Sequence, residues 1–541
     1  MAECESCKTK EVTITKEIID GSMETIRNLY LADDIPWVIG YSGGKDSTAA
    51  LQLVWLSLAS LPADKLKKTV HIINTNTLVE SPVVSRWADN SLKKMNEAAK
   101  AQGLPFVTHR LTPRTGETFW VNLLGKGYPF PRKRFRWCTD RLKIRPVNDF
   151  VKGCIAAHGE IILVLGTRKS ESANRAKTMA YYEKLRVREL LSPNPTLANE
   201  LVFSPLEDWN NNDVWVFLMQ YKNPWGYDNN DLLTMYRGAT EDGECPMMVE
   251  AGLPSCGKSR FGCWVCTMVE QDKSMEAMIA NDSEKEWMTP LLEFRNEIGN
   301  EYYENGSKDR DRERRDFRRM GGYLQGCGGR LNHGPYVRSQ REEWLKRLLQ
   351  IQLDINKDGP EEFADLELIT IDELKEIRRI WVKEKHEFAD TLPGIYEEVM
   401  GKPFPDDSLY ITSSFRKPEW DILKQVCDDN AVVMQDDGTT QPIVYSEEAP
   451  EHDSMLFQMM YTLIDIEANS DTMNNRKGIL DQIESTIKQH FYTDETDARK
   501  YYYDRTDRRR ANGGKFDERA YGDKGGDVLP ETEEEFDGDE E

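Results

Sequence analysis

The sequence predicts an α/β fold built on a parallel sheet that is flanked by helices. Apolar, β-branched runs alternate along the first half of the chain with longer segments that have helical periodicity. A glycine turn joins the first of these runs to a helix-forming segment, within residues 37–61. With 541 residues, 39% of them hydrophobic, the chain has room for about two to four domains. We therefore expect a globular protein whose first large domain is of the α/β class.

The stretch WVIGYSGGKDSTA, residues 37–49, predicts a strand, a tight turn and the start of a helix. A helix that begins here leaves its first backbone N–H groups unpaired, and its dipole is positive at this end. The side chain of Lys45 and the hydroxyls of Ser42 and Ser47 would converge with these amides on an anion such as phosphate. Asp46 stands where a Walker A loop has Ser or Thr, and its carboxylate could help to hold Mg²⁺. The alternative is an ordinary glycine turn between a strand and a helix.

Three further strands are predicted over residues 69–74, 106–111 and 161–165, and an amphipathic helix is predicted over residues 83–101. Parallel strands end at one edge of a sheet, so Asn74, after the second strand, should open onto the same edge as Ser42. The fourth strand leads to Arg168 and Arg175, and arginine forks suit phosphate oxygens. The same edge is thus expected to collect the anion-binding groups.

The turn sequence SGGKDST resembles the signature of the PP-loop ATP pyrophosphatases, which cleave ATP between its α and β phosphates. The resemblance covers about residues 35–225. It implies a PP-loop sheet, adenylation with pyrophosphate as the leaving group, and ATP and Mg²⁺ as cofactors. It also implies that Lys45, Asp46 and Arg168 are catalytic. The nucleotide-binding residues that it implies are Ser42, Gly43, Gly44, Lys45, Asp46, Ser47, Thr48, Asn74, Arg168 and Arg175.

A cysteine-rich stretch follows this region and contains Cys245, Cys256, Cys263 and Cys266. In a chain without a signal peptide, such a group favours metal-bound thiolates over disulfides, because the cytosol is reducing. A CxxC pair with upstream cysteines and small flanking residues is typical of a metal or Fe–S site. These residues alone leave zinc and a [4Fe–4S] cluster both open.

Cys138 in RWCTDRLKIRP, together with SCGKSRFGCWVCT, resembles the DndC family, the PP-loop proteins of bacterial DNA phosphorothioation. The resemblance implies a [4Fe–4S] cluster held by Cys138, Cys256, Cys263 and Cys266, with Cys245 as the alternative to Cys138. It implies DNA as substrate, a cysteine desulfurase as sulfur donor, and other phosphorothioation-system proteins as partners. In the implied reaction, ATP adenylates a DNA backbone phosphate, and sulfur then replaces a non-bridging oxygen.

Two other functions compete with this one. A sulfonucleotide reductase, acting on PAPS or APS, would need a catalytic cysteine in a C-terminal motif or an adjacent cysteine pair. The last cysteine here is Cys427, and the chain has neither feature. A DNA-binding Fe–S subunit with a vestigial nucleotide site is the second rival, and the intact turn at residues 42–48 argues against it. Transfer RNA thiolation differs from the main interpretation only in its substrate.

The formal net charge of -23 is unevenly distributed along the chain. Residues 131–146 contain seven bases and one acid, with Phe135 and Trp137 between the charges. Such a cluster suits a nucleic-acid backbone with rings available for stacking, or else it neutralises only the ATP polyphosphate. Residues 308–319 alternate in charge and predict a solvated helix. The glycine-rich stretch 320–336 predicts an ordered functional loop or a lid.

The expected domains are an N-terminal segment, a PP-loop domain, a cysteine-rich Fe–S and glycine-rich segment, a mainly helical C-terminal region and an acidic disordered tail. Their ranges are 1–34, 35–230, 231–340, 341–512 and 513–541. No apolar run reaches the about 18 residues that a membrane-spanning helix needs, and a signal peptide is not evident. We therefore expect a cytoplasmic protein without a membrane partner.

Overall fold

The computed structural model describes residues 14–132, 135–194, 197, 199–239, 261–300, 309–387, 389–406, 408, 417–429, 432–434, 440–442, 454–470, 478–492 and 494–511. The chain divides into two compact units. The first comprises Met1–Asn122, Phe130–Asn300 and Arg347–Leu374, and the second Leu123–Pro129, Glu301–Lys346 and Lys375–Glu541. Cys245, Cys256 and the predicted tail 513–541 lie outside the described residues. The domain boundaries expected from the sequence stay predictions.

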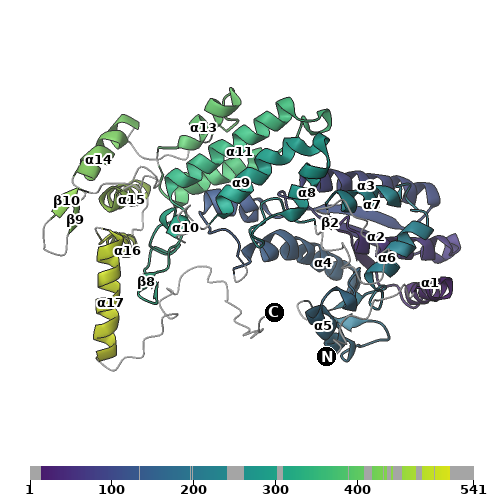
Figure 1. Cartoon of the computed structure of the whole chain (residues 1–541). Helices are drawn as coiled ribbons and strands as arrows, with labels where there is room; N and C mark the ends of the chain where they lie inside the picture. The colour runs from purple at the N-terminus through teal and green to yellow at the C-terminus, as the bar shows by residue number, and fades with distance from the viewer. Residues whose placement is uncertain are drawn as a thin grey trace, which may run out of the picture. The chain divides into compact units, whose positions relative to one another are not determined.

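The first unit contains a sheet and the helices that cover it (Figure 1). Its strands are β1 (Trp37–Gly40), β2 (Val70–Thr75), β3 (Phe106–Leu111), β4 (Ile161–Val164), β5 (Ser192–Pro193) and β6 (Glu200–Phe203). Its helices are α1 (Lys16–Leu31), α2 (Lys45–Ala59), α3 (Pro82–Gln102), α4 (Arg145–His158), α5 (Ala173–Glu183), α6 (Asn211–Gln220), α7 (Asn229–Gly238), α8 (Lys273–Asn281) and α9 (Thr289–Gly299). The predicted strands and the predicted helix at 83–101 are present within one or two residues.

The sheet has the strand order β3-β2-β1-β4-β6-β5. All neighbouring strands are parallel except the short edge strand β5, which runs antiparallel to β6. The strand order reverses between β1 and β4, because the chain first builds outward from β1 to β3 and then returns to the other side of β1. Ligands of open α/β sheets bind at such a switch point, outside the carboxyl ends of the strands.

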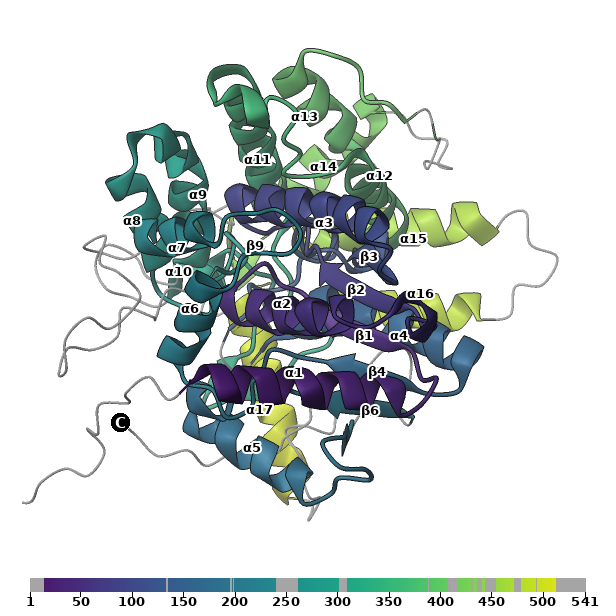
Figure 2. The same ribbon diagram turned by 90° about the vertical axis from the view of Figure 1, so that its right-hand side faces the viewer.

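Alternate residues of the strands pack into two separate cores, as the pleat of a sheet requires. On one face, Trp37 and Ile39 pack with buried residues of α1, α2, α3 and α6. On the other face, Val38 and Leu163 pack with Val151 of α4. Figure 2 shows α1 and α2 on the near side of the sheet. Both faces are therefore covered, which explains why β4 is buried at every position.

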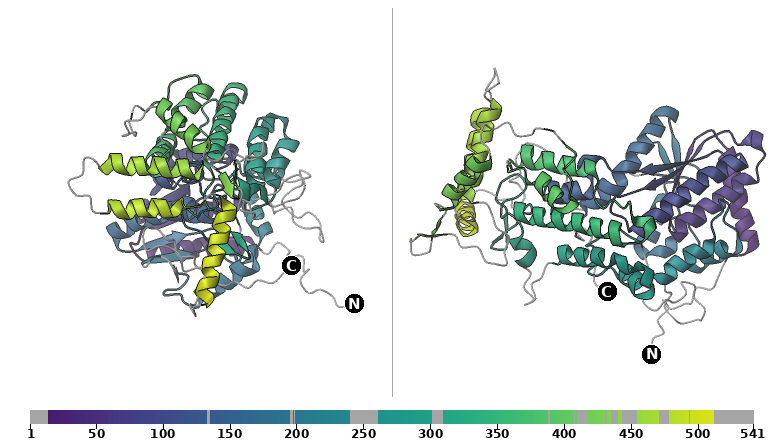
Figure 3. Two further views of the ribbon diagram at one scale, coloured as in Figure 1. Left: turned by 90° about the vertical axis from the view of Figure 1, so that its left-hand side faces the viewer. Right: turned by 90° about the horizontal axis from the view of Figure 1, so that it is seen from above.

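The second unit is mainly helical. It contains α10 (Asp309–Glu313), α13 (Thr391–Met400), α14 (Lys417–Asp429), α15 (Met455–Ser470), α16 (Ile479–Gln489) and α17 (Glu495–Ala511), with the short strands β7 (Gly326–Cys327), β8 (Arg330–Leu331), β9 (Val432–Met434) and β10 (Thr440–Pro442). Helices α11 (Arg338–Asp358) and α12 (Ile371–Arg379) have residues in both units. In the second unit, α15 and α16 lie side by side (Figure 3). The predicted fold class, a parallel α/β sheet flanked by helices with a helical C-terminal region, is confirmed.

The charge-alternating segment does not form the solvated helix that was predicted. Helix α10 covers only five residues of it. Arg314 and Arg318 are buried, and Arg318 donates to the Asp316 carboxylate at 2.5 Å. Arg312 donates to His333 Nε2 at 2.9 Å and contacts Glu495 at the start of α17. Burial of a charge is costly unless it is paired, so these contacts make the segment an internal charge network.

The glycine-rich stretch contains an ordered hairpin in which β7 pairs antiparallel with β8. Gly328 and Gly329 form its turn with φ of +58° and +81°, a conformation that side chains other than glycine rarely adopt. A Cβ at Gly326 would lie 2.5 Å from the Tyr502 ring of α17. The stretch is therefore the ordered loop of the two predicted alternatives. Within the described ranges, none of the helices combines the length and apolar character that a membrane crossing needs.

Candidate active site

The turn between β1 and α2 forms as the sequence predicts. Ser47 Oγ accepts from the Ser42 N–H at 3.1 Å and donates to the Gly44 carbonyl at 3.0 Å. Gly43 has φ of +77°, which glycine adopts without strain. Gly44 is the N-cap residue of α2, and no side chain caps the helix. The N-cap residue itself therefore offers no carboxylate or hydroxyl to the first amides of α2, which lie at the sheet edge.

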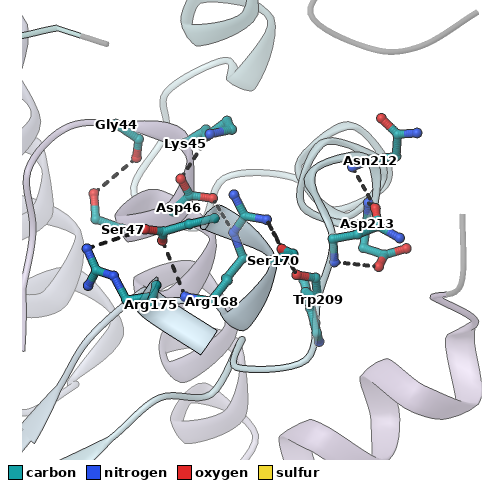
Figure 4. Close-up of polar contacts among 12 residues, drawn as sticks. Gly44, Lys45, Asp46, Ser47, Arg168, Ser170, Arg175, Trp209, Asn212 and Asp213 are labelled. Carbon is teal, nitrogen blue, oxygen red and sulfur yellow. Dashed lines mark hydrogen bonds and ion pairs between the residues drawn. The ribbon is translucent and has the colours of Figure 1, made fainter. Parts of the chain in front are cut away.

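Two cations meet the Asp46 carboxylate beside these amides (Figure 4). Lys45 Nζ lies 2.9 Å from Oδ2, and Arg168 Nε lies 2.8 Å from Oδ1. The Arg168 contact is an ion pair without an aligned hydrogen bond. The Arg168 side chain is only 4% exposed, and its Nη1 donates to Ser170 Oγ at 2.9 Å. Because α2 follows β1 and Arg168 follows β4, the predicted residues converge at the switch point of the sheet.

The loop after β4 approaches α2 closely at Gly166. A Cβ at this position would lie 2.6 Å from the Asp46 carbonyl oxygen and 3.0 Å from the Ser47 nitrogen. Only glycine fits such a contact without moving the backbone. Gly166 thus allows Arg168 to reach the first turn of α2, and sequence reasoning did not assign it a role.

Asn74 lies at the same edge, as predicted. Its Nδ2 donates to the Tyr41 carbonyl at 2.7 Å, and its Oδ1 accepts from Arg110. Arg110 also donates to Ser85 Oγ at 2.8 Å and lies 2.9 Å from Asp89. Asn74 therefore links the end of β2 to the β1–α2 turn (residues 41–44), which is called the phosphate turn below after its predicted ligand. Arg110 links Asn74 to β3 and to α3.

Arg175 is placed differently from the other predicted arginine. Its Nη2 lies 3.5 Å from Glu171, and its side chain is 45% exposed. Its backbone N–H donates to Ser172 Oγ at 3.1 Å at the start of α5. The structure thus joins Arg168 to Asp46 and pairs Arg175 of α5 with Glu171 just before that helix.

Three of the predicted metal ligands lie in the described part of the chain. Burial raises the pKa of the Cys138 thiol, and the charge of Cys266 raises it further. Burial also raises the pKa of Cys263, while the charge of Lys143 opposes that shift. The charge of Cys266 raises the pKa of both Cys138 and Cys263, so Cys266 lies near each of these two thiols. Among the described residues, however, no group of three His, Cys, Asp or Glu side chains is arranged to hold a metal ion.

The Cys263 segment is fastened to the loop that follows β2. Trp264 N–H donates to the Val79 carbonyl at 3.0 Å, and Cys263 forms a β-bridge with Glu80. Thr77 Oγ1 lies 3.4 Å from Cys263 Sγ. Cys263 therefore adjoins the loop that follows β2, and Asn74 near the end of β2 contacts the Tyr41 carbonyl before the phosphate turn.

Buried Arg295 of α9 holds the other side of the cysteine segment. It donates to the Cys266 carbonyl from two nitrogens, at 3.0 and 2.7 Å, and to the Glu270 carbonyl at 2.7 Å. Burial lowers the pKa of Arg295. An arginine that is largely desolvated in this way fixes the backbone around Cys266, and its isolated position in the sequence gave no indication of that role.

The basic cluster at residues 131–146 is less accessible than predicted. Arg141 is buried and contacts Asn122, while Arg145 contacts Glu117 and lies 2.7 Å from Asp140. Trp137 is buried and stacks on Phe119 at a ring distance of 5.5 Å, so the prediction of a ring free for base stacking is wrong for Trp137. Exposed members of the cluster remain, namely Phe135, Arg136 and Lys143.

Tyr236 of α7 is a further residue at the site that sequence reasoning missed. Its hydroxyl accepts a hydrogen bond from the Lys45 N–H at 3.2 Å. Lys45 Nζ lies 5.7 Å from the centre of the same ring. A lone tyrosine in an amphipathic helical pattern is usually a core residue, so periodicity could not have identified it.

Comparison with known proteins matches residues 36–268 to the phosphoadenosine phosphosulfate reductase domain family. The matched residues contain the parallel sheet and the turn at Asp46, so this α/β region is similar to the PAPS reductase domain. An uncharacterized protein of Methanocaldococcus jannaschii is 24% identical over 200 residues, which is 37% of this chain and 35% of that protein. The match thus spans about a third of the length of that relative.

Several solved structures are also similar to this chain. The phosphoadenylyl-sulfate reductase of Candida auris is 13% identical, with a TM-score of 0.24, over 41% of this chain and 93% of that one. The U34-tRNA thiolase NcsA of Methanococcus maripaludis, with its [4Fe-4S] cluster, is 15% identical, with a TM-score of 0.25, over 42% of this chain and 78% of that one. The FMN adenylyltransferase of Candida glabrata is 13% identical, with a TM-score of 0.25, over 42% of this chain and 65% of that one.

Proposed function

We propose that this chain is an ATP pyrophosphatase that adenylates a backbone phosphate of DNA and so prepares it for sulfur transfer. One observation carries the nucleotide part of the proposal. Lys45 and Arg168 meet at Asp46 beside the first amides of α2, at the switch point of a parallel sheet. The match of residues 36–268 to the PAPS reductase domain family supports a nucleotide substrate.

In the proposed reaction, an oxygen of the DNA phosphate attacks the α-phosphorus of ATP, and pyrophosphate leaves with the electron pair of the broken P–O bond. The α2 amides and Lys45 bind the phosphate oxygens and offset the negative charge of the leaving group. Arg168 supplies a second cation, and Asp46 keeps both cations in place before ATP arrives. A two-electron reductant cleaves the persulfide of the sulfur donor and releases sulfide. The sulfide then attacks the adenylated DNA phosphorus, AMP leaves with the bridging oxygen and its electron pair, and a P–S bond has replaced a P–O bond.

Asp46 was predicted as a Mg²⁺ ligand, and the contacts of its carboxylate do not suit that role. Both oxygens already contact a cation, Lys45 Nζ at 2.9 Å and Arg168 Nε at 2.8 Å. Mg²⁺ takes oxygen ligands and water, and the positive charges of Lys45 and Arg168 would repel it from this carboxylate. The proposed steps therefore assign charge stabilisation to Lys45 and Arg168.

The thiol group fits an iron–sulfur cluster by the chemistry of its donors. Cys138, Cys263 and Cys266 are neighbours, and Cys256, which lies outside the described residues, would complete the set. Burial raises the pKa of Cys138 and Cys263, so metal binding must displace protons from these thiols. A bound [4Fe–4S] cluster would supply a redox-active centre beside the sulfur-transfer step.

The choice of DNA as substrate rests on the likeness of the Cys138 and Cys263 segments to the DndC family. The charge of exposed Lys143 opposes the rise that burial causes in the pKa of both Cys138 and Cys263, so a cation of the kind that suits a phosphate lies near these thiols. A nucleic-acid phosphate bound by Lys143 would therefore lie near the proposed sulfur-transfer site. A cysteine desulfurase as sulfur donor and further modification proteins belong to the same proposal.

The test compares DNA from cells that carry the wild-type chain, the Lys45→Ala variant, or neither. Total DNA is digested with nuclease and searched by mass spectrometry for phosphorothioate dinucleotides. We expect them only with the wild-type chain, in cells that also supply the partner proteins. Thiolated nucleosides in transfer RNA with unmodified DNA would instead indicate an RNA substrate. Release of sulfite from PAPS by the purified chain would indicate a sulfonucleotide reductase and overturn the proposal.

A further inference from the structure

Tyr236 stands between the phosphate turn and the cysteine segment, and it touches both. Its hydroxyl accepts from the Lys45 N–H at 3.2 Å, and a Cβ on Gly44 would lie only 3.1 Å from the same hydroxyl. On its other side, the Tyr236 ring meets the Phe261 ring edge-on, with centroids 4.9 Å apart at 77°. Phe261 precedes Cys263 by two residues.

We propose that Tyr236 is a positioning residue through which nucleotide occupancy of the phosphate turn is transmitted to the cysteine segment. The proposal deepens the proposed function and rests on it, because it requires a polyphosphate at the N-terminus of α2. A backbone N–H donates one strong hydrogen bond, so a phosphate oxygen and the Tyr236 hydroxyl compete for the Lys45 amide. Binding of the phosphate displaces the hydroxyl.

Lys45 strengthens this response through its side chain. Its Nζ lies 5.7 Å from the centre of the Tyr236 ring and 2.9 Å from Asp46. A polyphosphate draws the ammonium group toward itself, which removes the cation from the face of the ring. Both contacts between Lys45 and Tyr236 are therefore lost in the same binding event.

The direction in which the ring can move is set by its surroundings. Trp215 of α6 is fully buried, and its ring packs edge-on against the Tyr236 ring with centroids 5.3 Å apart. Trp215 therefore blocks movement of the Tyr236 ring on that side. Phe261 is only partly buried and belongs to a segment outside any helix. Packed interiors transmit displacement to the neighbour that can yield, and here that neighbour is Phe261.

The Phe261 segment reaches the thiols through a short run of backbone. The Trp264 N–H donates to the Val79 carbonyl at 3.0 Å, and Cys263 Sγ lies 3.4 Å from Thr77 Oγ1. Loss of the Phe261–Tyr236 contact weakens the contact of Trp264 with Val79 and that of Cys263 with Thr77. Nucleotide binding thus changes the placement of Cys263 at the moment when sulfur transfer is needed.

The experiment measures hydrogen exchange of the peptide 261–267 in the full-length chain, with and without saturating α,β-methylene ATP. Calorimetry confirms occupancy in the same samples. In the wild type we expect faster exchange of the Trp264 amide when the analogue is bound, since local opening governs exchange of a hydrogen-bonded amide. Phe261→Leu removes the ring contact whose loss opposes binding, so it should bind the analogue at least as tightly as the wild type and show no nucleotide-dependent exchange.

Tyr236→Phe provides a second variant that keeps the ring and removes only the hydroxyl. The free protein then lacks the group that competes for the Lys45 amide, and we expect the analogue to bind about three- to tenfold more tightly. Tyr181→Phe, at an exposed tyrosine, is the matched control and should change neither affinity nor exchange.

The possible failures are distinguishable. If the wild-type chain does not bind the analogue at all, the nucleotide site of the proposed function is wrong. If it binds the analogue with no change in exchange at residues 261–267, or if Phe261→Leu responds like the wild type, Tyr236 does not couple the two segments. Unchanged or weaker binding by Tyr236→Phe would show that the hydroxyl does not compete with phosphate.

Discussion

Arg168 is the residue on which the electrostatics of the site depend most. Replacing it with Met keeps an apolar stem and removes the cation 2.8 Å from Asp46. We expect the rate of pyrophosphate release to fall by about 10²-fold, because a preorganised cation at a phosphate is lost. The free energy of unfolding should fall by about 1–3 kcal/mol, since a buried oxygen of Asp46 is left unpaired.

Lys169→Met is the matched control, because Lys169 adjoins Arg168 but its side chain is 28% exposed and pairs with Asp208. Surface pairs of this kind contribute about 0–1 kcal/mol, so stability and pyrophosphate release should remain close to wild type. Equal effects of the two substitutions, measured by chemical unfolding and a pyrophosphate assay, would contradict the special role of Arg168.

Two histidines, His71 on β2 and His109 on β3, are expected to lower the free energy of unfolding in acid. His71 Nδ1 lies 3.0 Å from His109 Nε2. Burial lowers the pKa of both, and the nearby charges of His109 and His158 lower that of His71 further. The unfolded chain therefore takes up protons first as the pH falls below about 6.5, so the free energy of unfolding decreases from there downward.

Urea unfolding at about pH 7.5 and about pH 5.5 measures this effect. The double variant His71→Phe/His109→Leu should show a smaller difference between the two pH values than the wild type, whatever its absolute stability. An identical pH dependence in both proteins would show that the histidine pair is not the source.

At Gly166, the loop after β4 closely approaches the first turn of α2. Gly166→Ala would place a Cβ 2.6 Å from the Asp46 carbonyl oxygen, so one backbone must move. We expect a loss of about 1–3 kcal/mol in the free energy of unfolding and impaired nucleotide binding. Thermal unfolding and calorimetry with an ATP analogue test both effects.

Gly153→Ala is the control for this substitution. Gly153 lies within α4, and a Cβ there would meet nothing within 4 Å. Alanine favours a helix over glycine, so this variant should be more stable than wild type by about 0.5–1 kcal/mol. Destabilisation by both substitutions to a similar extent would mean that the close approach at Gly166 is unimportant.

The elements that the sequence predicted are those with a strong local pattern. The strands β1, β2, β3 and β4 were predictable because they are β-branched runs between turns. The SGGKDST turn was predictable because its own residues supply its hydrogen bonds. The convergence of Asn74 and Arg168 followed from the rule that parallel strands share a carboxyl edge. Local pattern and tertiary structure agree in these elements.

The errors arose where tertiary packing decides the outcome. Trp137 and Arg141 belong to a basic run that looks exposed, but they pack against Phe119 and Asn122. The charges of residues 309–319 look solvated, but Arg318 finds Asp316 and the backbone of α16. Tyr236 contacts a residue 191 positions away. Contacts between residues so distant in the sequence leave no periodic pattern from which they could be predicted.

At the scale of the whole chain, the cysteines predict a coloured protein. Protein purified without oxygen should be brown and absorb near ~400 nm, as thiolate-bound Fe–S clusters do. Substitution by Ser of any predicted ligand, namely Cys138, Cys256, Cys263 or Cys266, should bleach it. Bleaching by Cys245→Ser but not by Cys138→Ser would reassign the fourth ligand, and a colourless protein with stoichiometric zinc would refute the cluster.

In the proposed function, the β1–α2 turn directs cleavage of ATP between its α and β phosphates. The most direct test is to incubate the full-length chain and duplex DNA with ATP labelled in the adenine ring and in the γ-phosphate, and to identify the products. We predict that the γ label appears in pyrophosphate and the adenine label in AMP or adenylated DNA, and that Asp46→Ala and Lys45→Ala abolish both. Formation of ADP and labelled orthophosphate, or unchanged pyrophosphate release in both variants, would contradict the claim.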